Sequence, residues 1–104
     1  MHRAPTYFSD ILPVRGRGPL RVTLHAEDDT LVLAVSPANG DPAPEHPPAN
    51  VTLRGLRRMV VAVAGNCRLG AWEPFHEVDG TRAGWVTTVR GRRVAEVVSW
   101  LGEW

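Results

Sequence analysis

The sequence predicts an α+β fold, a two-layer sandwich in which helices pack on a sheet. Three observations carry this prediction: a hairpin pattern that begins near residue 20, a helical stripe after residue 50 and a second helical stripe close to the C-terminus. Strands joined by hairpins, with helices between them, are typical of this class. The predicted order is β-β-α-β-β-α. It implies a mainly antiparallel four-stranded sheet with the helices on one face.

The hairpin is expected over residues 20–36. In "PLRVTLHA" apolar residues alternate with polar ones, which is the period of a half-buried strand. The turn "EDDT" follows, and "LVLAV" returns as the second strand. Residues 37–50 then hold five of the nine prolines and are expected to form an irregular loop. This proline-rich loop is either a ligand loop that has lost its chemistry or a linker.

Both helices are predicted from apolar residues at helical spacing. The stripes are Leu56, Met59, Val60 and Val63 in the first helix, and Val94, Val97, Val98 and Leu101 in the second. Gly65 and Asn66 provide a left-handed stop for the first helix. The second stripe lies in an additional C-terminal helix, which is predicted over residues 92–104. Between the helices, "CRLGAW" and "GWVTTVR" are predicted as strands joined by the loop "EPFHEVDGTRA". The segment Ile11-Leu12 is compatible with one helical turn, limited by Pro13.

Length and composition bound the class of protein. With 104 residues the chain is expected to form one domain, 1–104. Its net charge of +1 predicts no nucleic-acid partner. The sequence has neither an apolar run long enough for a membrane span nor a signal peptide, so no membrane partner and a cytoplasmic location are expected. The single cysteine, Cys67, is typical of a reducing compartment.

The stretch "VTLRGLRRMVVAVAGNCRLG" resembles the end of the ATP-binding domain of bacterial sensor histidine kinases. That family has a helix of the form G-L-x-G-M-R-E-R-V, followed by L-G-G and a strand. The matching positions are Leu53, Arg54, Gly55, Leu56, Arg57, Val60 and Gly65. Upstream, "FSDILPVRGRGPLRVTLHAEDDTLVLAV" is similar to the family's L-T-N-V-x-R-H helix end and the hairpin after it, and "GWVTTV" is similar to the closing strand. The resemblance covers residues 6–90 and implies a partial Bergerat-like fold.

The same resemblance implies that ATP binding has been lost. Asp10 stands where the family's Mg²⁺-binding asparagine lies, and Pro37 stands where an aspartate binds adenine. The two glycines that approach the phosphates correspond to Asn50 and Thr52, whose side chains obstruct that approach. We therefore expect no cofactor. No Cys/His cluster has metal-ligand spacing, so no metal site is expected.

A few residues remain as candidates for chemistry. His76 and Glu77 lie in a predicted loop, where a histidine beside a carboxylate can act as a general base. Arg54 and Arg57 are candidates for binding an anion at the start of a helix, and Asn39 for binding a ligand in the proline-rich loop.

Two classes of function remain open. One is a kinase-derived binding or regulatory module that acts through a protein or peptide partner, or through self-association. The alternative is a small tailoring enzyme, for example in peptide natural-product biosynthesis, in which Asp10, His76 or Glu77 moves protons. A homodimer is expected in either case, with Trp100 and Trp104 of the last helix at its interface.

Overall fold

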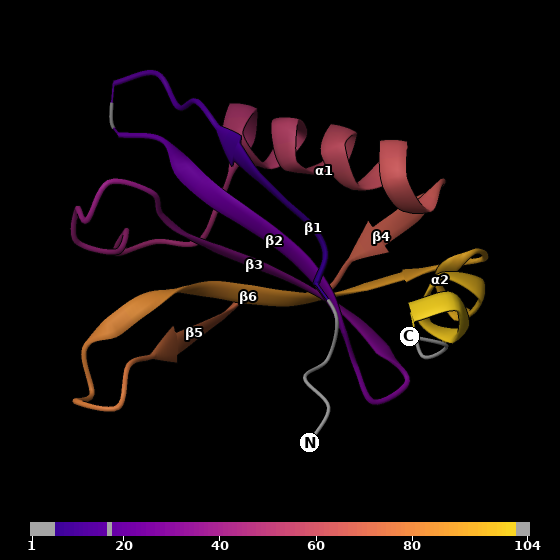
Figure 1. Ribbon diagram of the computed structural model, residues 1–104. Coiled ribbons are helices and arrows are strands. Elements are labelled where there is room, and N and C mark those ends of the chain that lie inside the picture. Colours follow the sequence, from indigo (N-terminus) through magenta and orange to yellow (C-terminus); the bar gives the residue numbers. More distant parts are fainter. Residues whose placement is uncertain (1–5, 17, 102–104) are drawn as a thin grey trace.

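The computed structural model describes residues 6–16 and 18–101, which form one twisted sheet and two helices (Figure 1). The strands are β1 (Thr6–Leu12), β2 (Leu20–Glu27), β3 (Thr30–Pro37), β4 (Cys67–Leu69), β5 (Glu73–His76) and β6 (Arg82–Gly91), and the helices are α1 (Asn50–Ala64) and α2 (Val94–Leu101). The α+β class is confirmed. The predicted number of strands is wrong, because the sheet has six strands and not four.

The sheet is antiparallel throughout, in the order β1-β2-β3-β6-β4, with β5 also paired to β6. The ten-residue strand β6 is long enough to carry two partners on one edge. Its first half pairs with β5 and its last residues pair with β4. Residues near the two ends of β6 are therefore about 30 Å apart. Figure 1 shows β5 and the β4–α2 region at opposite ends of this strand.

Both strands that the sequence prediction missed lie at edges of the sheet. Ile11-Leu12 belongs to β1, not to a helical turn, and pairs with Leu20 and Arg21 of β2. The segment predicted as a loop after the third strand contains β5, which pairs with β6 through a hairpin. The hairpin expected over residues 20–36 is present as β2 and β3, paired from Leu20↔Pro37 to Glu27↔Thr30.

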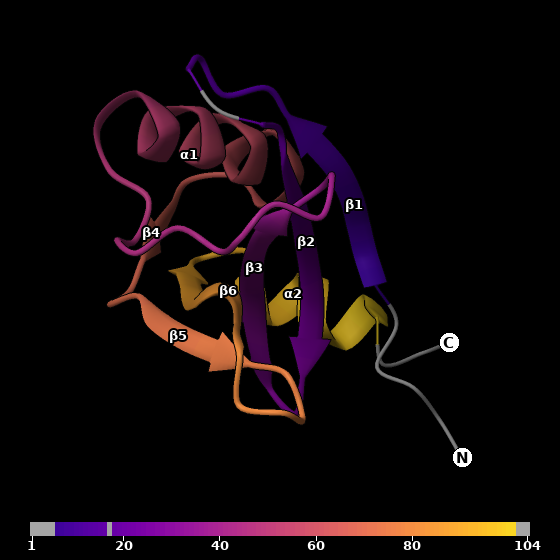
Figure 2. The ribbon, with the colours of Figure 1, turned by 90° about the vertical axis from the view of Figure 1, so that its left-hand side faces the viewer.

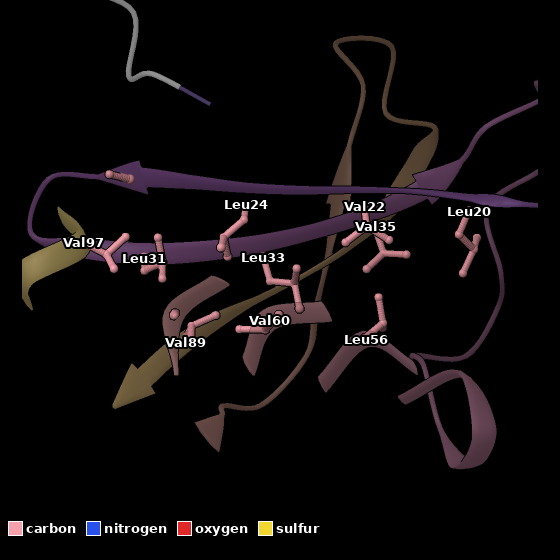
Figure 3. Packing of buried hydrophobic residues seen from close by; sticks show 12 residues of the cluster. Leu20, Val22, Leu24, Leu31, Leu33, Val35, Leu56, Val60, Val89 and Val97 are labelled. Carbon is pink, nitrogen blue, oxygen red and sulfur yellow. The ribbon is translucent and has the colours of Figure 1, made fainter. Parts of the chain in front are cut away.

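The core lies between one face of the sheet and α1 (Figure 3). It consists of Leu20, Val22, Leu24, Ala26, Leu31, Leu33, Val35, Leu56, Val60, Ala64, Val89 and Val97. The residues from β2 and β3 share one face because successive strand side chains alternate. α1 buries Leu56, Val60 and Ala64 and ends at Gly65, the predicted stop. The φ of 74° at Gly65 is positive and favours glycine, but its ψ of −165° differs from the left-handed helical conformation that the sequence predicted. α2 packs against β3 and β6 and adds Val97.

The other face of the sheet is covered less completely. Along β2, Thr23 and His25 are half-buried and Arg21 is exposed, whereas the alternating apolar residues are buried. On the edge strand β1, Ile11 is 40% exposed. Among the described residues, neither helix has both the length and the apolar character needed to cross a membrane.

Candidate functional site

The proline-rich loop is held firmly on the sheet. The indole Nε1 of Trp85 donates a hydrogen bond of 2.9 Å to the carbonyl of Pro44. Arg82 donates from Nη1 to the carbonyls of Glu45 at 3.3 Å and Pro44 at 3.5 Å. The Arg82 guanidinium also lies 5.4 Å from the centre of the Trp85 ring, in reach of a cation–π interaction. Figure 2 shows this loop running across the sheet from β3 to α1. These contacts disfavour the interpretation of the loop as a mere linker.

The start of the loop is a compact turn. Gly40 has a φ of 81°, and the backbone N–H of Asp41 donates to Oδ1 of Asn39 at 3.4 Å. The side chains of Asn39 and Asp41 lie against Gly18, where a Cβ atom would collide with both. Asn39 therefore shapes the loop, and Asp41 is one of the residues that line the adjacent hollow.

A groove of about 660 Å³ lies between this loop and the β5–β6 hairpin. We call it the loop–hairpin groove, and its lining includes Pro37, Asp41, Pro42, Phe75, Glu77 and Arg82. Asp41 comes from the loop wall and Glu77 from the hairpin wall. The ion pairs among the described residues are His25–Glu27 and Arg93–Glu96, so neither groove carboxylate is neutralised by an ion pair within that part of the chain.

The hairpin wall of the groove is a tightly bonded turn. The N–H of Thr81 donates to Oδ1 of Asp79 at 2.9 Å, and the N–H of Glu77 donates to the carbonyl of Thr81 at 2.8 Å. The backbone N–H and then the hydroxyl of Thr81 lower the pKa of Asp79 below its ordinary value of 3.8. Gly80 supplies the positive φ of 89° that this turn needs.

The predicted catalytic residues do not form one site. Asp10 lies on β1, where its Oδ1 accepts the N–H of Ile11 at 2.8 Å. His76 ends β5 and Glu77 follows it, and both are exposed. The pairing row that contains Asp10 passes through Val22, Val35, Trp85 and Pro74. Four strand spacings of about 4.8 Å put roughly 19 Å between Asp10 and β5, so these groups cannot act on the same small ligand.

The remaining predicted residues are distributed over other parts of the molecule. Arg54 and Arg57 are exposed on α1 and do not line the groove. The side chain of Trp100 and the whole of Trp104 fall outside the described residues. Within the described part of the chain, no three His, Cys, Asp or Glu side chains are placed to hold a metal ion.

Sequence reasoning missed Arg82 and Trp85, the two residues that hold the loop. Their partners are backbone carbonyls about 40 positions earlier in the chain. Every residue has a backbone carbonyl, so residue types do not reveal which one accepts a hydrogen bond. The one available signal was the proline content of residues 37–50, because proline has no backbone N–H and holds a loop in few conformations.

Comparisons with protein families, with curated proteins and with solved structures found no match to this chain.

Proposed function

We propose that the protein is a binding module whose loop–hairpin groove takes an extended, basic segment of a partner protein. The observation that carries this proposal is two acidic residues, Asp41 and Glu77, on opposite walls of one groove. Arg82 also lines the groove but donates to the carbonyls of Pro44 and Glu45, so neither carboxylate has a cation of the described chain as an ion-pair partner. An arginine or lysine side chain from a partner would supply that cation. Hydrogen bonds between such groups are among the stronger ones in proteins.

The walls of the groove support the same proposal. Phe75 and Pro42 offer apolar surface beside the carboxylates, and the methylene stem of a lysine or arginine packs well on such surface. The loop wall is already fixed by the hydrogen bonds of Trp85 and Arg82 to Pro44 and Glu45. Because a fixed wall loses little conformational entropy on binding, more of the contact energy remains as affinity.

The position of β5 suggests how the segment would lie. Within the described residues β5 pairs with β6 alone, so its outer edge has unpaired backbone groups. A partner segment can add to such an edge as a further strand and place alternate side chains towards the groove. A segment that pairs with the edge of a strand is itself extended, and for this reason the proposed ligand is an extended segment.

Of the two function classes predicted from the sequence, this proposal takes the binding module. The separation of Asp10 from His76 and Glu77 across the sheet leaves the enzyme alternative with His76 and Glu77 alone as residues that could move protons at one site. Descent from a sensor kinase is a further part of the sequence prediction, and the binding proposal does not depend on it.

The test uses a fluorescein-labelled eight-residue peptide of alternating arginine and valine. Fluorescence anisotropy should show binding to the wild-type chain, and the double variant Asp41→Asn/Glu77→Gln should bind at least about tenfold more weakly, since two charge-assisted hydrogen bonds are lost. A matched control, Glu27→Gln/Asp29→Asn, removes two exposed carboxylates at the β2–β3 turn. It should retain affinity within about twofold. Equal losses in both double variants, or no binding by the wild type, would overturn the proposal.

A further inference from the structure

Arginine is distributed unevenly along the chain. Residues 54–72 and 83–95 together contain seven of the twelve arginines and no aspartate or glutamate. The seven are Arg54, Arg57, Arg58, Arg68, Arg90, Arg92 and Arg93, and all are exposed. We call five of them the arginine surface, because they meet where β4, the end of β6 and the end of α1 come together: Arg57, Arg68, Arg90, Arg92 and Arg93. The acidic residues that balance them in the net charge of +1 lie elsewhere in the sequence.

The fold brings these two segments together. β4 pairs with the end of β6, and in this pairing Arg68 stands directly opposite Arg90. A hollow of about 380 Å³ beside them is lined by Cys67, Arg68, Arg90 and Arg92. α1 contacts β4, and the charge of Arg57 reaches Cys67, where it opposes the rise in the thiol pKa that burial causes. The side chain of Arg93 packs against Gly65 at the end of α1.

This arrangement is unfavourable for the isolated chain. Like charges directly opposite on neighbouring strands destabilise a sheet, and Arg68 and Arg90 are such a pair. α1 carries three arginines and no acidic residue, so it lacks the i,i+4 pairs that support a surface helix. Two acidic groups lie beside this surface: Glu96, 3.9 Å from Arg93, and Asp29, which shares a second hollow with Arg90. Two carboxylates do not neutralise the five guanidinium groups of the arginine surface.

We propose that the arginine surface binds the phosphate backbone of a double-stranded nucleic acid without reading its bases. A guanidinium group presents a planar fork of donors that matches a phosphate, and all the basic residues here are arginine. The surface spans a helix, two strands and a turn, so it suits a row of phosphates better than one small anion. None of the exposed large apolar residues in the described chain is aromatic. Single-stranded nucleic acids bind by stacking their bases on exposed aromatic rings, so a double strand fits this surface better.

The low net charge does not oppose this binding. Charges in solution act over a screening length of about 8–10 Å at physiological salt, and the opposite ends of β6 are farther apart than that. The acidic groove near β5 therefore contributes little to the field at Arg68 and Arg90. The net charge predicted no nucleic-acid partner because a sum over the chain contains no information about position.

The experiment measures binding of a fluorescein-labelled 20-base-pair DNA duplex by anisotropy between 50 and 200 mM NaCl, with an RNA duplex of the same sequence in parallel. Affinity should fall linearly on a log–log plot, with a slope of roughly −0.9 for each phosphate contact. Arg68→Gln and Arg90→Gln should each weaken binding by about tenfold at 50 mM salt and make the slope shallower by about one. Equal effects with DNA and RNA are expected, since the bases and sugars are not read.

Arg21→Gln is the matched control, because Arg21 is also an exposed strand arginine but lies on β2, outside the arginine surface. It removes the same charge and should change affinity by less than about twofold. Thermal unfolding confirms that all three variants fold. The proposal is overturned if the duplexes do not bind at 50 mM salt, if Arg21→Gln has the same effect as Arg68→Gln, or if phosphatidylserine vesicles or poly-glutamate bind more tightly than the duplexes. This test does not involve Asp41 or Glu77, so its failure leaves the groove proposal standing.

Discussion

Trp85 links two parts of the chain that are distant in sequence, the loop over residues 37–50 and the central strand β6. Its ring also borders a small cavity of about 110 Å³ beneath Pro44, His46 and the start of α1. The residue therefore sets where the loop enters the helix. The position of the loop wall, and with it the width of the loop–hairpin groove, depends on this contact.

Replacing Trp85 with phenylalanine keeps an aromatic ring but removes the donor to Pro44. We expect a loss of about 1 kcal/mol in the free energy of unfolding, the usual contribution of one hydrogen bond, and faster amide hydrogen exchange in residues 38–49. Urea unfolding and hydrogen-exchange NMR measure the two effects. Trp72→Phe is the control, since the half-buried Trp72 makes no side-chain hydrogen bond within the described chain. A loop unchanged by Trp85→Phe would contradict the anchoring role.

Asp79 makes the turn of the groove hairpin sensitive to acid. Its folded-state pKa lies below 3.8 because Thr81 donates to its carboxylate, so its contribution to stability is present above that pH. The contribution is lost as the pH falls through the folded-state pKa. We expect Asp79→Asn to be slightly less stable than the wild type at pH 7, with the difference vanishing in strong acid. Carbon-13 NMR titration of the Asp79 carboxyl group checks the pKa, and a value of 3.8 or above would contradict this account.

At the scale of elements, periodicity predicted the central parts of the fold and failed at its edges. β2 was predictable because one face is buried and apolar residues alternate along it. β3 was predictable as a short apolar run after a turn, in which Val32 is buried as well as Leu31 and Leu33. β5 was not, because it has four residues, one of them Pro74, and a proline in a short polar segment normally indicates a loop. Proline is tolerated here because β5 pairs on one side only within the described sheet. β1 has the same one-sided pairing.

The pairing of β4 with β6 yields a prediction that separates stability from binding. Arg68→Glu places a carboxylate opposite Arg90, so a repulsive cross-strand pair becomes an attractive one. We expect the free energy of unfolding to rise by about 0.5–1 kcal/mol at low salt, while affinity for duplex DNA falls. Urea unfolding at 20 mM and 1 M NaCl measures the gain, which should shrink in high salt. A variant less stable than the wild type at low salt would show that the two arginines do not repel each other.

At the scale of the whole molecule, the candidate site was predictable only in part. Glu77 and the proline-rich loop were singled out from the sequence and both border the groove. Asp10 and His76 were grouped by chemical type, and the sheet separates them by the width of several strands. Arg82, Trp85 and the Arg68–Arg90 pair depend on contacts between distant segments, which residue types and local spacing cannot reveal.

The arrangement of layers also bears on the predicted homodimer. α1 covers one face of the sheet, while the opposite face has half-buried residues such as Thr23 and Val86 and the exposed Ile11 at its edge. Alternation along β6 puts Arg90 on the same face as Val86. A second copy that covers this face over β1 and β2 would leave the arginine surface and the loop–hairpin groove accessible. The predicted interface residues Trp100 and Trp104 have no described side chains, so the expectation now depends on this sheet face.

We therefore expect sedimentation equilibrium at micromolar concentration to give twice the mass of one chain. Ile11→Arg puts a charge on that face at a position that is already 40% exposed and directly opposite Arg21. The monomer should lose at most about 1 kcal/mol to the like-charge pair, while the dimer weakens by roughly tenfold or more, as expected when a charge is buried without a partner. Val78→Arg is the matched control, because Val78 is fully exposed at the tip of the β5–β6 hairpin, away from that face. A single-chain mass for the wild type, or equal weakening by both substitutions, would contradict a dimer built on this face.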